Sequence, residues 1–362
     1  MYLYYTDITD MSKYRIGIIA KDILNKNTTG IENYTINILN EFNKSSEFQF
    51  YLYTNHEYIN KYKNIKHIYI KNRKAWLHTS LAKRIIQDDI DLIFSPIPSL
   101  PIITKKKIKK VITVHDLFFK YMTKNLNSTK LFFKNAILKS DKIISVSKYT
   151  KSEILKYYKI DKNKINVIYE SYDKNLYKYI SKKNMSSPIK ILCVGTINKR
   201  KNFTQIVKVI PVIKDVFGDI KLTIIGNKGD DYENLLRTIK DFKLEKDVIV
   251  SGYVSNDELA GEYRKSDLFL YISKEEGFGL PILEAFASGV PVVTSENSST
   301  KEIAKNAAIL VDPENLMDIA DGIIEAIKRN NQLIQLGLKE IEKFSWEKTG
   351  SETLKLFREL LN

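Results

Sequence analysis

Two carboxylates flank a glycine-rich turn in the second half of the chain. Glu276 and Glu284 stand on either side of the sequence Gly-Phe-Gly-Leu-Pro-Ile-Leu. Pro281 suits the first position of a helix and Gly289 suits its end, so the pattern predicts a short helix over residues 281–288. The unpaired N–H groups at the start of a helix carry partial positive charge and form an anion site, typically for phosphate.

The residues around this predicted helix match the parts of a sugar nucleotide. Gly277 and Gly279 let the backbone approach a ligand closely. Glu284 lies about one turn into the helix, where its carboxylate can accept hydrogen bonds from two neighbouring hydroxyls, as a ribose offers. Glu276 precedes the loop and can face a second polyol. The alternative is a tight strand-to-helix connection with two solvated acids.

Polar residues also follow other predicted strands of the second half. Arg200 and Lys201 lie in "GTINKRKNF" (195–203), where cations can hold a diphosphate. Gly252, Tyr253 and Val254 follow a third strand and can offer backbone groups to the edge of a base. Taken singly, each of these segments can also be an ordinary turn.

The first half of the chain carries two further candidates. His115 and Asp116 end the strand in "VITVHDLFF", where an imidazole can hydrogen-bond a donor sugar. Gly30 opens a predicted helix after "NTT" and can let the backbone approach the diphosphate from the opposite wall of a site. A satisfied loop histidine and a turn glycine are the alternatives.

Short apolar runs alternate with amphipathic stretches along the whole chain, which predicts an α/β protein with parallel sheets. The expected strands of the first half cover residues 14–20, 49–54, 91–96, 109–116 and 142–147, with helices over 31–42 and 147–158. The expected strands of the second half cover residues 189–197, 220–226, 247–254, 266–273, 290–295 and 307–312, with helices over 202–217, 231–242 and 280–288. Two doubly wound domains in series are expected to bind ligands at the carboxyl ends of their strands, in the cleft between them.

A polar stretch over residues 170–190 ends in Ser-Ser-Pro and is expected to be the interdomain linker. The expected domains are residues 1–180 and 188–344, with residues 1–11 as a tail and 345–362 as a separate amphipathic helix. No uncharged apolar run approaches the ~20 residues that span a bilayer. The N-terminus lacks a signal-peptide core. The single cysteine, Cys193, excludes intrachain disulfides, fits a reducing cytoplasm and is expected to pack in a buried strand.

The net charge of +15 is concentrated in the first half. Residues 1–187 hold 34 Lys and Arg against 16 Asp and Glu, whereas residues 188–362 hold 24 against 27. The densest clusters are "KNRKAW" (71–76) and "TKKKIKK" (104–110). A basic half indicates a polyanionic surface partner: anionic lipid headgroups, a diphosphate-linked substrate or nucleic acid.

The motifs together resemble those of the retaining GT-B glycosyltransferases of glycosyltransferase family 4, in the glycosyl transferases group 1 superfamily. The resemblance covers residues 13–360 and is carried mainly by "ILCVGTINKRKNF", "SDLFLYISKEEGFGLPILEAFASGVPVVTS" and "EIAKNAAILVDP". It implies two Rossmann-like domains that face each other across a cleft, the first binding the acceptor and the second the nucleotide sugar. It also implies a final helix that crosses back onto the first domain, and sugar transfer with retained anomeric configuration.

The resemblance also implies roles for the motif residues. Glu276 would contact the hydroxyls of the donor sugar, and Glu284 would bind the ribose. Arg200 and Lys201 would neutralise the leaving diphosphate, and His115 would reach the donor sugar from the first domain. Backbone groups of the loop and helix start would hold sugar and phosphate, namely those of Phe278, Gly279, Leu280 and Pro281. Thr196 follows Gly195 where many family members have arginine, which leaves the diphosphate to the two cations.

A cation pair and a helix N-terminus can stabilise the leaving group without a metal, so we expect neither a metal nor a cofactor. An Asp-x-Asp sequence, Asp89-Ile90-Asp91, precedes its strand, whereas a metal-binding pair should follow one. Because no enzymatic nucleophile stands out, the sequence favours front-face attack by the acceptor.

The expected function is transfer of a hexose from a nucleotide-diphosphate sugar to a lipid-diphosphate-linked glycan, in bacterial cell-surface polysaccharide synthesis. The form "GTINKRKN" resembles that of bacterial O-antigen mannosyltransferases and related hexosyltransferases, and this resemblance favours GDP-mannose as the donor, with UDP-hexoses next. The expected place is cytoplasmic, peripheral on the inner face of the membrane, held by the basic first domain. A nucleotide-sugar 2-epimerase of GT-B fold is the alternative. A nucleic-acid-binding protein is a third reading, against which stands the lack of recognised basic and aromatic motifs.

Overall fold

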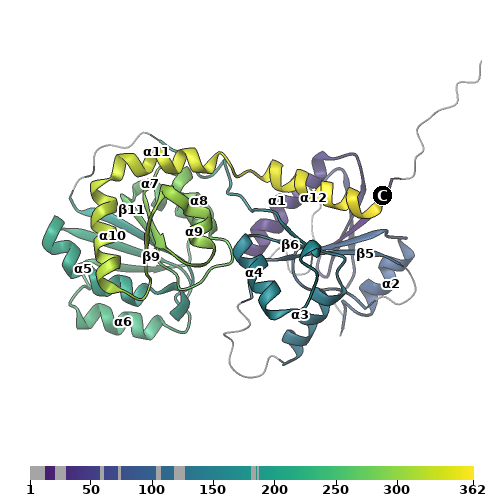
Figure 1. Ribbon diagram of the computed structural model, residues 1–362, viewed down its shortest axis with the longest axis horizontal. Coiled ribbons are helices and arrows are strands. Elements are labelled where there is room, and N and C mark those ends of the chain that lie inside the picture. The colour runs from purple at the N-terminus through teal and green to yellow at the C-terminus, as the bar shows by residue number, and fades with distance from the viewer. Residues whose placement is uncertain are drawn as a thin grey trace, which may run out of the picture. The chain divides into compact units, whose positions relative to one another are not determined.

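The computed structural model describes residues 13–20, 30–57, 61–71, 75–102, 107–117, 127–180, 185 and 187–362. The chain divides into two compact units, each described here by itself (Figure 1). The first unit comprises the chain up to Val146, Lys151–Ile168 and Trp346–Asn362. The second comprises Ser147–Thr150 and Tyr169–Ser345. Segments distant in sequence therefore build each unit.

The first unit contains a parallel sheet of seven strands in the order β3-β2-β1-β4-β5-β6-β7. The strands are β1 (Arg15–Ile19), β2 (Gln49–Thr54), β3 (Ile65–Tyr69), β4 (Leu92–Ser95), β5 (Lys109–Val114), β6 (Lys142–Ser145) and β7 (Ile165–Val167). The helices are α1 (Gly30–Lys44), α2 (Ser80–Gln87), α3 (Asn127–Lys139), α4 (Lys148–Tyr157), whose first turn groups with the second unit, and α12 (Trp346–Leu361). The strand order reverses between β1 and β4, the point at which doubly wound sheets bind ligands.

The final helix, α12, packs on α1 within the first unit. Its Phe357 is fully buried beside Phe42 of α1, with ring centroids 5.7 Å apart. Gly350 allows this approach, because a Cβ at that position would lie 2.5 Å from the Cβ of Glu41. The last helix of the chain is therefore part of the core of the unit that begins the chain.

The second unit contains a parallel sheet of six strands in the order β10-β9-β8-β11-β12-β13. The strands are β8 (Ile189–Val194), β9 (Ile220–Ile225), β10 (Val248–Gly252), β11 (Leu268–Tyr271), β12 (Val292–Ser295) and β13 (Ile309–Val311). The helices are α5 (Phe203–Phe217), α6 (Tyr232–Asp241), α7 (Asn256–Lys265), α8 (Leu280–Ala287), α9 (Ser298–Ala304), α10 (Leu316–Lys328) and α11 (Asn330–Ile341). Here the order reverses between β8 and β11.

The apolar runs of the second unit lie where a parallel sheet covered on both faces requires them. All four residues of β11 and all four of β12 are buried. Cys193 on β8 is fully buried, as predicted. The residues of the first unit form separate clusters on the two faces of its sheet, so each unit has its own core.

The polar stretch after β7 differs from the linker that the sequence predicts. Tyr172 and Tyr177 are buried, and the stretch groups with the second unit from Tyr169 onward. Tyr179 packs on Gly289, where a Cβ would lie 2.1 Å from its ring. Aromatic anchors among polar neighbours therefore tie this stretch to the second unit.

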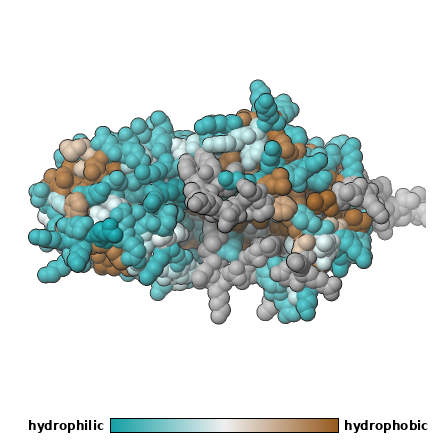
Figure 2. Space-filling view, turned by 90° about the horizontal axis from the view of Figure 1, so that it is seen from below, coloured by the Kyte–Doolittle hydropathy of each residue, from teal (hydrophilic) through white to brown (hydrophobic). Residues whose placement is uncertain are grey.

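On the face that Figure 2 shows, most described side chains are hydrophilic, and apolar ones form small groups between them. Within the described residues, each helix is too short or too polar to cross a bilayer.

Candidate functional site

The predicted motif residues of the second unit follow the two central strands. β8 leads into a short 3-10 helix over Lys199–Lys201, and β11 leads into the glycine-rich loop before α8. Because β8 and β11 are adjacent and parallel, the two loops leave the same edge of the sheet. This edge is the switch point where doubly wound folds bind their ligands.

A carboxylate and two cations meet at this edge. The Nζ of Lys201 lies 2.7 Å from Oε1 of Glu276, and the Nη1 of Arg200 lies 2.5 Å from the same oxygen. The side chains are 9% and 23% exposed for the two cations and 8% for the carboxylate. Lys201 also donates to the hydroxyl of Tyr271 at 2.8 Å. The sequence predicts all three charged residues for the site, and the structure brings them into direct contact.

Glycine at position 195 makes room for the lysine of this cluster. Gly195 directly follows β8 with φ of +143°, and a Cβ there would lie 2.8 Å from Cε of Lys201. The Lys201 backbone is fixed in turn by Asn198, whose side-chain oxygen accepts from its N–H at 3.1 Å. The turn therefore directs the ammonium group toward Glu276.

The charge of Glu276 is stabilised by its neighbours. Burial by itself raises the pKa of this carboxyl, but Lys201 and Arg200 outweigh that effect and lower the pKa to about 2. Glu276 is thus ionised throughout the neutral range. It forms ion pairs with both cations.

Hydroxyl groups fix the backbone of the loop between Glu276 and α8. Ser299 donates to the carbonyls of Glu276 and Phe278, both at 2.8 Å. Ser147 and Thr150 donate to the carbonyl of Gly277 at 2.6 and 3.0 Å. A loop so anchored is a rigid platform for a ligand.

Within the described residues, the start of α8 has no side-chain cap. Gly279 stands at the N-cap in the left-handed region with φ of +111°, and Pro281 lies in the first turn. The helix covers Leu280–Ala287, close to the predicted ranges of 280–288 and 281–288. Pro281 has no N–H, and the N–H of Ile282 donates to the carbonyl of Gly279 at 2.9 Å, so at most the N–H groups of Leu280 and Leu283 can face an anion.

Glu284 lies on this helix and is held by two tyrosines. Tyr263 donates to its Oε2 at 3.0 Å, and the hydroxyl of Tyr177 also hydrogen-bonds the carboxylate. Burial raises the pKa of Glu284 to about 7, although both tyrosine hydrogen bonds lower it. The two glutamates of the motif therefore differ strongly in pKa because their surroundings differ.

The residues expected to contact the nucleotide base lie at the end of β10, an outermost strand of the six-stranded sheet. Gly252 ends β10 with φ of +74°, and its carbonyl accepts from the N–H of Gly226 at 2.8 Å. Tyr253 is 44% exposed and Val254 is half-buried. Their contact with a base stays a prediction.

His115 and Gly30 belong to the first unit. His115 donates from Nε2 to the carbonyl of Pro96 at 2.9 Å, and its ring meets Tyr34 edge-on with centroids 4.9 Å apart. Gly30 is the first residue of α1, and residues 21–29 before it lie outside the described residues. Their roles toward a donor stay predictions.

Both carboxylates of the Asp-x-Asp sequence contact Arg15, the first residue of β1. Asp91 accepts from the backbone N–H of Arg15 at 2.8 Å, and Asp89 lies 3.7 Å from its guanidinium group. These carboxylates fix the first residue of the strand.

Sequence reasoning did not find several residues that support the site. These are Tyr271 beneath Lys201, the tyrosines on Glu284, and the hydroxyls on the loop: Ser147, Thr150, Tyr177, Tyr263, Tyr271 and Ser299. No spacing signal marks them, because each is distant in sequence from its partner.

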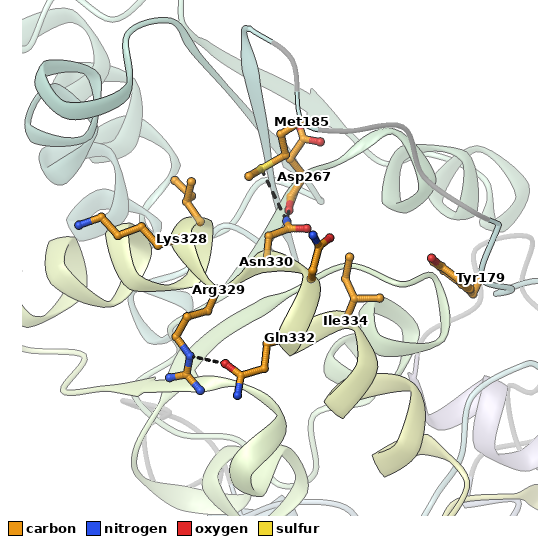
Figure 3. A pocket seen from close by; sticks show the side chains of 10 residues that line it. Tyr179, Met185, Asp267, Lys328, Arg329, Asn330, Gln332 and Ile334 are labelled. Atoms are coloured by element: carbon orange, nitrogen blue, oxygen red, sulfur yellow. Dashed lines mark hydrogen bonds between the residues drawn. The ribbon is translucent and has the colours of Figure 1, made fainter.

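A cavity of about 500 Å³ lies elsewhere in the second unit (Figure 3). Asp267 lines it directly before β11, whereas the motif follows that strand. Asn330 and Arg329 also line it, and Figure 3 shows Arg329 bonded to Gln332. It contains none of the predicted site residues.

Two family models match the chain. Residues 28–176 match Glycosyltransferase Family 4, and residues 174–340 match Glycosyl transferases group 1. Solved structures agree with this in fold. Sucrose-phosphate synthase from Thermosynechococcus elongatus superposes with a TM-score of 0.78 at 16% identity, covering 96% of this chain and 99% of that one. HepE of Anabaena, in complex with UDP and glucose, gives 0.72 at 15%, covering 96% and 100%.

The fold and the paired family models define a glycosyltransferase chain of the GT-B class. It is similar to the O-antigen chain mannosyltransferase RfbU of Salmonella typhimurium, with 31% identity over 209 residues, or 57% of each chain. The alignment thus spans little more than half of that relative. The chain belongs to glycosyltransferase family 4, with the group 1 domain in its second half.

Proposed function

We propose that the chain transfers a hexose from a nucleotide-diphosphate sugar to a glycan acceptor, with retention of the anomeric configuration. The observation that carries the proposal is the cluster of Arg200, Lys201 and Glu276 at the same sheet edge as the uncapped start of α8. Two cations and a helix N-terminus suit a diphosphate, and an anchored carboxylate suits sugar hydroxyls.

The leaving group is the nucleoside diphosphate. As the bond between the anomeric carbon and the diphosphate oxygen breaks, negative charge develops on that oxygen. Lys201, Arg200 and the N–H groups at the start of α8 stabilise this charge. The acceptor hydroxyl attacks the same face of the sugar, and its proton passes to the departing oxygen. This step balances without a metal or an enzymatic nucleophile.

Glu276 has two tasks in this scheme. Without a ligand it neutralises the two cations, and with the donor bound it accepts hydrogen bonds from the sugar hydroxyls. Its lowered pKa suits the second task, because an ionised carboxylate only accepts. The cations are then shared between the carboxylate and the diphosphate.

GDP-mannose is the favoured donor, and mannose is the sugar that would be transferred. The name of the Salmonella relative, an O-antigen chain mannosyltransferase, supports mannose. The Anabaena structure with UDP and glucose supports UDP-hexoses as the second choice. A lipid-diphosphate-linked glycan of a bacterial surface polysaccharide is the proposed acceptor.

The first unit is proposed to dock on an anionic membrane. Helix α3 exposes Leu131 at 64% and Phe132 at 49%, and exposed lysines lie on the same helix at Lys130 and Lys134. Apolar side chains among lysines suit the interface of an anionic bilayer. Parts of the two densest basic clusters, residues 72–74 and 104–106, lie outside the described residues.

A thermal-shift screen with UDP, GDP, dTDP and their sugars tests the proposal. A ligand at a hundred times its dissociation constant should add about 2.7 kcal/mol of stability. Mass spectrometry of the same mixtures with a lipid-diphosphate glycan should then detect a product one hexose heavier. Absence of a stabilising nucleotide would refute the proposal, and conversion of the donor to an epimer without acceptor would select an epimerase instead.

A further inference from the structure

Two buried tyrosines converge on one side of Glu284. Tyr263 comes from α7 and is fully buried, whereas Tyr177 comes from the irregular stretch after β7 and is 5% exposed. Their rings meet edge-on with centroids 5.6 Å apart and an interplanar angle of 83°. Neither side chain can turn away without leaving a void, so both hydroxyls are fixed toward the carboxylate.

The two hydroxyls act only as donors to Glu284. Burial, and then the nearby Glu284 charge, raise the pKa of both Tyr177 and Tyr263, so both phenols stay protonated. An ionised carboxylate has about four lone-pair sites on its two oxygens. Two sites are occupied by the tyrosines, which leaves two for a ligand. A ribose offers two neighbouring hydroxyls.

No cation offsets the charge of Glu284 among the groups of the described residues that set its pKa. Burial comes first, followed by the two tyrosine hydrogen bonds. Tyr271 of β11 also senses the charge, since Glu284 contributes to its raised pKa. The charges of Asp173 and Asp257 also raise the pKa of Tyr177. The tyrosine hydroxyls are therefore the groups that favour the ionised carboxylate.

We propose that Tyr177 and Tyr263 are positioning residues, which hold Glu284 ionised and oriented as the acceptor for the paired ribose hydroxyls of the nucleotide. This proposal rests on the proposed function. It adds two positioning residues and an expected effect of each hydroxyl on the pKa of Glu284. With one hydroxyl removed, the carboxylate loses both an orienting contact and a stabilising donor. The pKa of Glu284 then rises further, and a larger share of the protein is protonated at neutral pH.

The experiment measures affinity for UDP, GDP and their 2′-deoxy analogues by calorimetry between pH 6 and 8.5. The variants are Tyr177→Phe and Tyr263→Phe, which keep the rings, together with Glu284→Gln. Tyr232→Phe is the matched control, because Tyr232 is a half-buried tyrosine at the start of α6 in the same unit. Each comparison of ribose with deoxyribose is made within one variant, so a reduced folded fraction does not affect it.

For each of the two site variants we expect about tenfold weaker binding at pH 7, as for loss of a hydrogen bond to a charged group. The pH at the midpoint of the change in nucleotide affinity should rise. The ratio of the affinities for the ribose and the 2′-deoxyribose nucleotides should become smaller. In a transfer assay KM for the donor should rise while kcat changes little, and Tyr232→Phe should behave as wild type.

Two outcomes distinguish a failure of the positioning role from a failure of the proposed function. If the nucleotides bind and Glu284→Gln weakens them, while both tyrosine variants keep the wild-type pH midpoint and ribose preference, the positioning role is wrong and the proposed function stands. If wild type binds none of the nucleotides, the proposed function fails and the inference with it.

Discussion

Replacing Glu276 with glutamine should destabilise the second unit by about 3 kcal/mol at pH 7. The pKa of this carboxyl is about 2 in the folded chain against an ordinary 4.5, and each pKa unit corresponds to about 1.4 kcal/mol. Because the folded pKa is depressed, the stabilisation is present above about pH 4.5 and is lost as the pH falls toward 2. Removing one partner from a buried ion pair typically costs about 3–5 kcal/mol, which agrees with the destabilisation derived from the pKa of Glu276.

The two tryptophans allow the units to be followed separately. Trp76 and Trp346 both belong to the first unit, so fluorescence excited at 295 nm reports its unfolding, whereas far-ultraviolet circular dichroism follows both units. In urea, Glu276→Gln should move the transition of the second unit down by about 1–2 M, for a slope near 2 kcal/mol per M. The fluorescence midpoint should move less.

A double-mutant cycle with Lys201→Met tests whether the lost ion pair with Lys201 causes the destabilisation by Glu276→Gln. Because each single variant breaks the same buried pair, the double variant should be much less destabilised than the sum of the two. Glu262→Gln is the control, since the pair of Glu262 with Lys265 is largely exposed and its loss should cost under about 1 kcal/mol. Additive effects, or a Glu276 variant as stable as the control, would refute the reasoning.

Three further predictions concern ligand and membrane. Nucleotide affinity should fall by about tenfold from pH 8 to 6, because Glu284, with a pKa of about 7, loses the charge that accepts the ribose hydroxyls; calorimetry should show no such slope for Glu284→Gln. Gly195→Ala should weaken UDP or GDP binding by about tenfold, since the new Cβ displaces Lys201 from its path, and wild-type affinity would contradict that path. Replacing Leu131 and Phe132 together with serine should lower co-sedimentation with anionic vesicles severalfold while leaving nucleotide affinity unchanged, and undiminished sedimentation would argue against docking through α3.

The central strands β11 and β12 of the second unit could be predicted closely because they are buried on both faces. The apolar run of β11 starts after Asp267 and ends before Ser273, and that of β12 starts after Gly289. β3 and β7 of the first unit were missed. β3 has two buried residues three positions apart, Ile65 and Ile68, so it lacks a strict alternation of buried and exposed residues, and β7 has only three residues. Such short or mixed segments carry little periodic signal.

The charged residues of the site could be predicted because they lie in short loops after strands. Glu276, Arg200 and Lys201 are placed there by local sequence, and the parallel sheet brings their loops together. The sequence assigned the cations to a diphosphate and did not predict that they pair with Glu276. Tyr177 and Tyr263 could not be found this way, because 86 residues of folded chain separate them and only tertiary packing joins them to Glu284.

The most direct test of the central claim is an experimental structure of the chain with GDP or UDP bound. We predict that phosphate oxygens lie within hydrogen-bonding distance of the N–H groups at the start of α8, near Arg200 and Lys201, with the ribose hydroxyls on Glu284. A nucleotide bound instead in the cavity beside Asp267, or a helix start covered by side chains, would contradict the account.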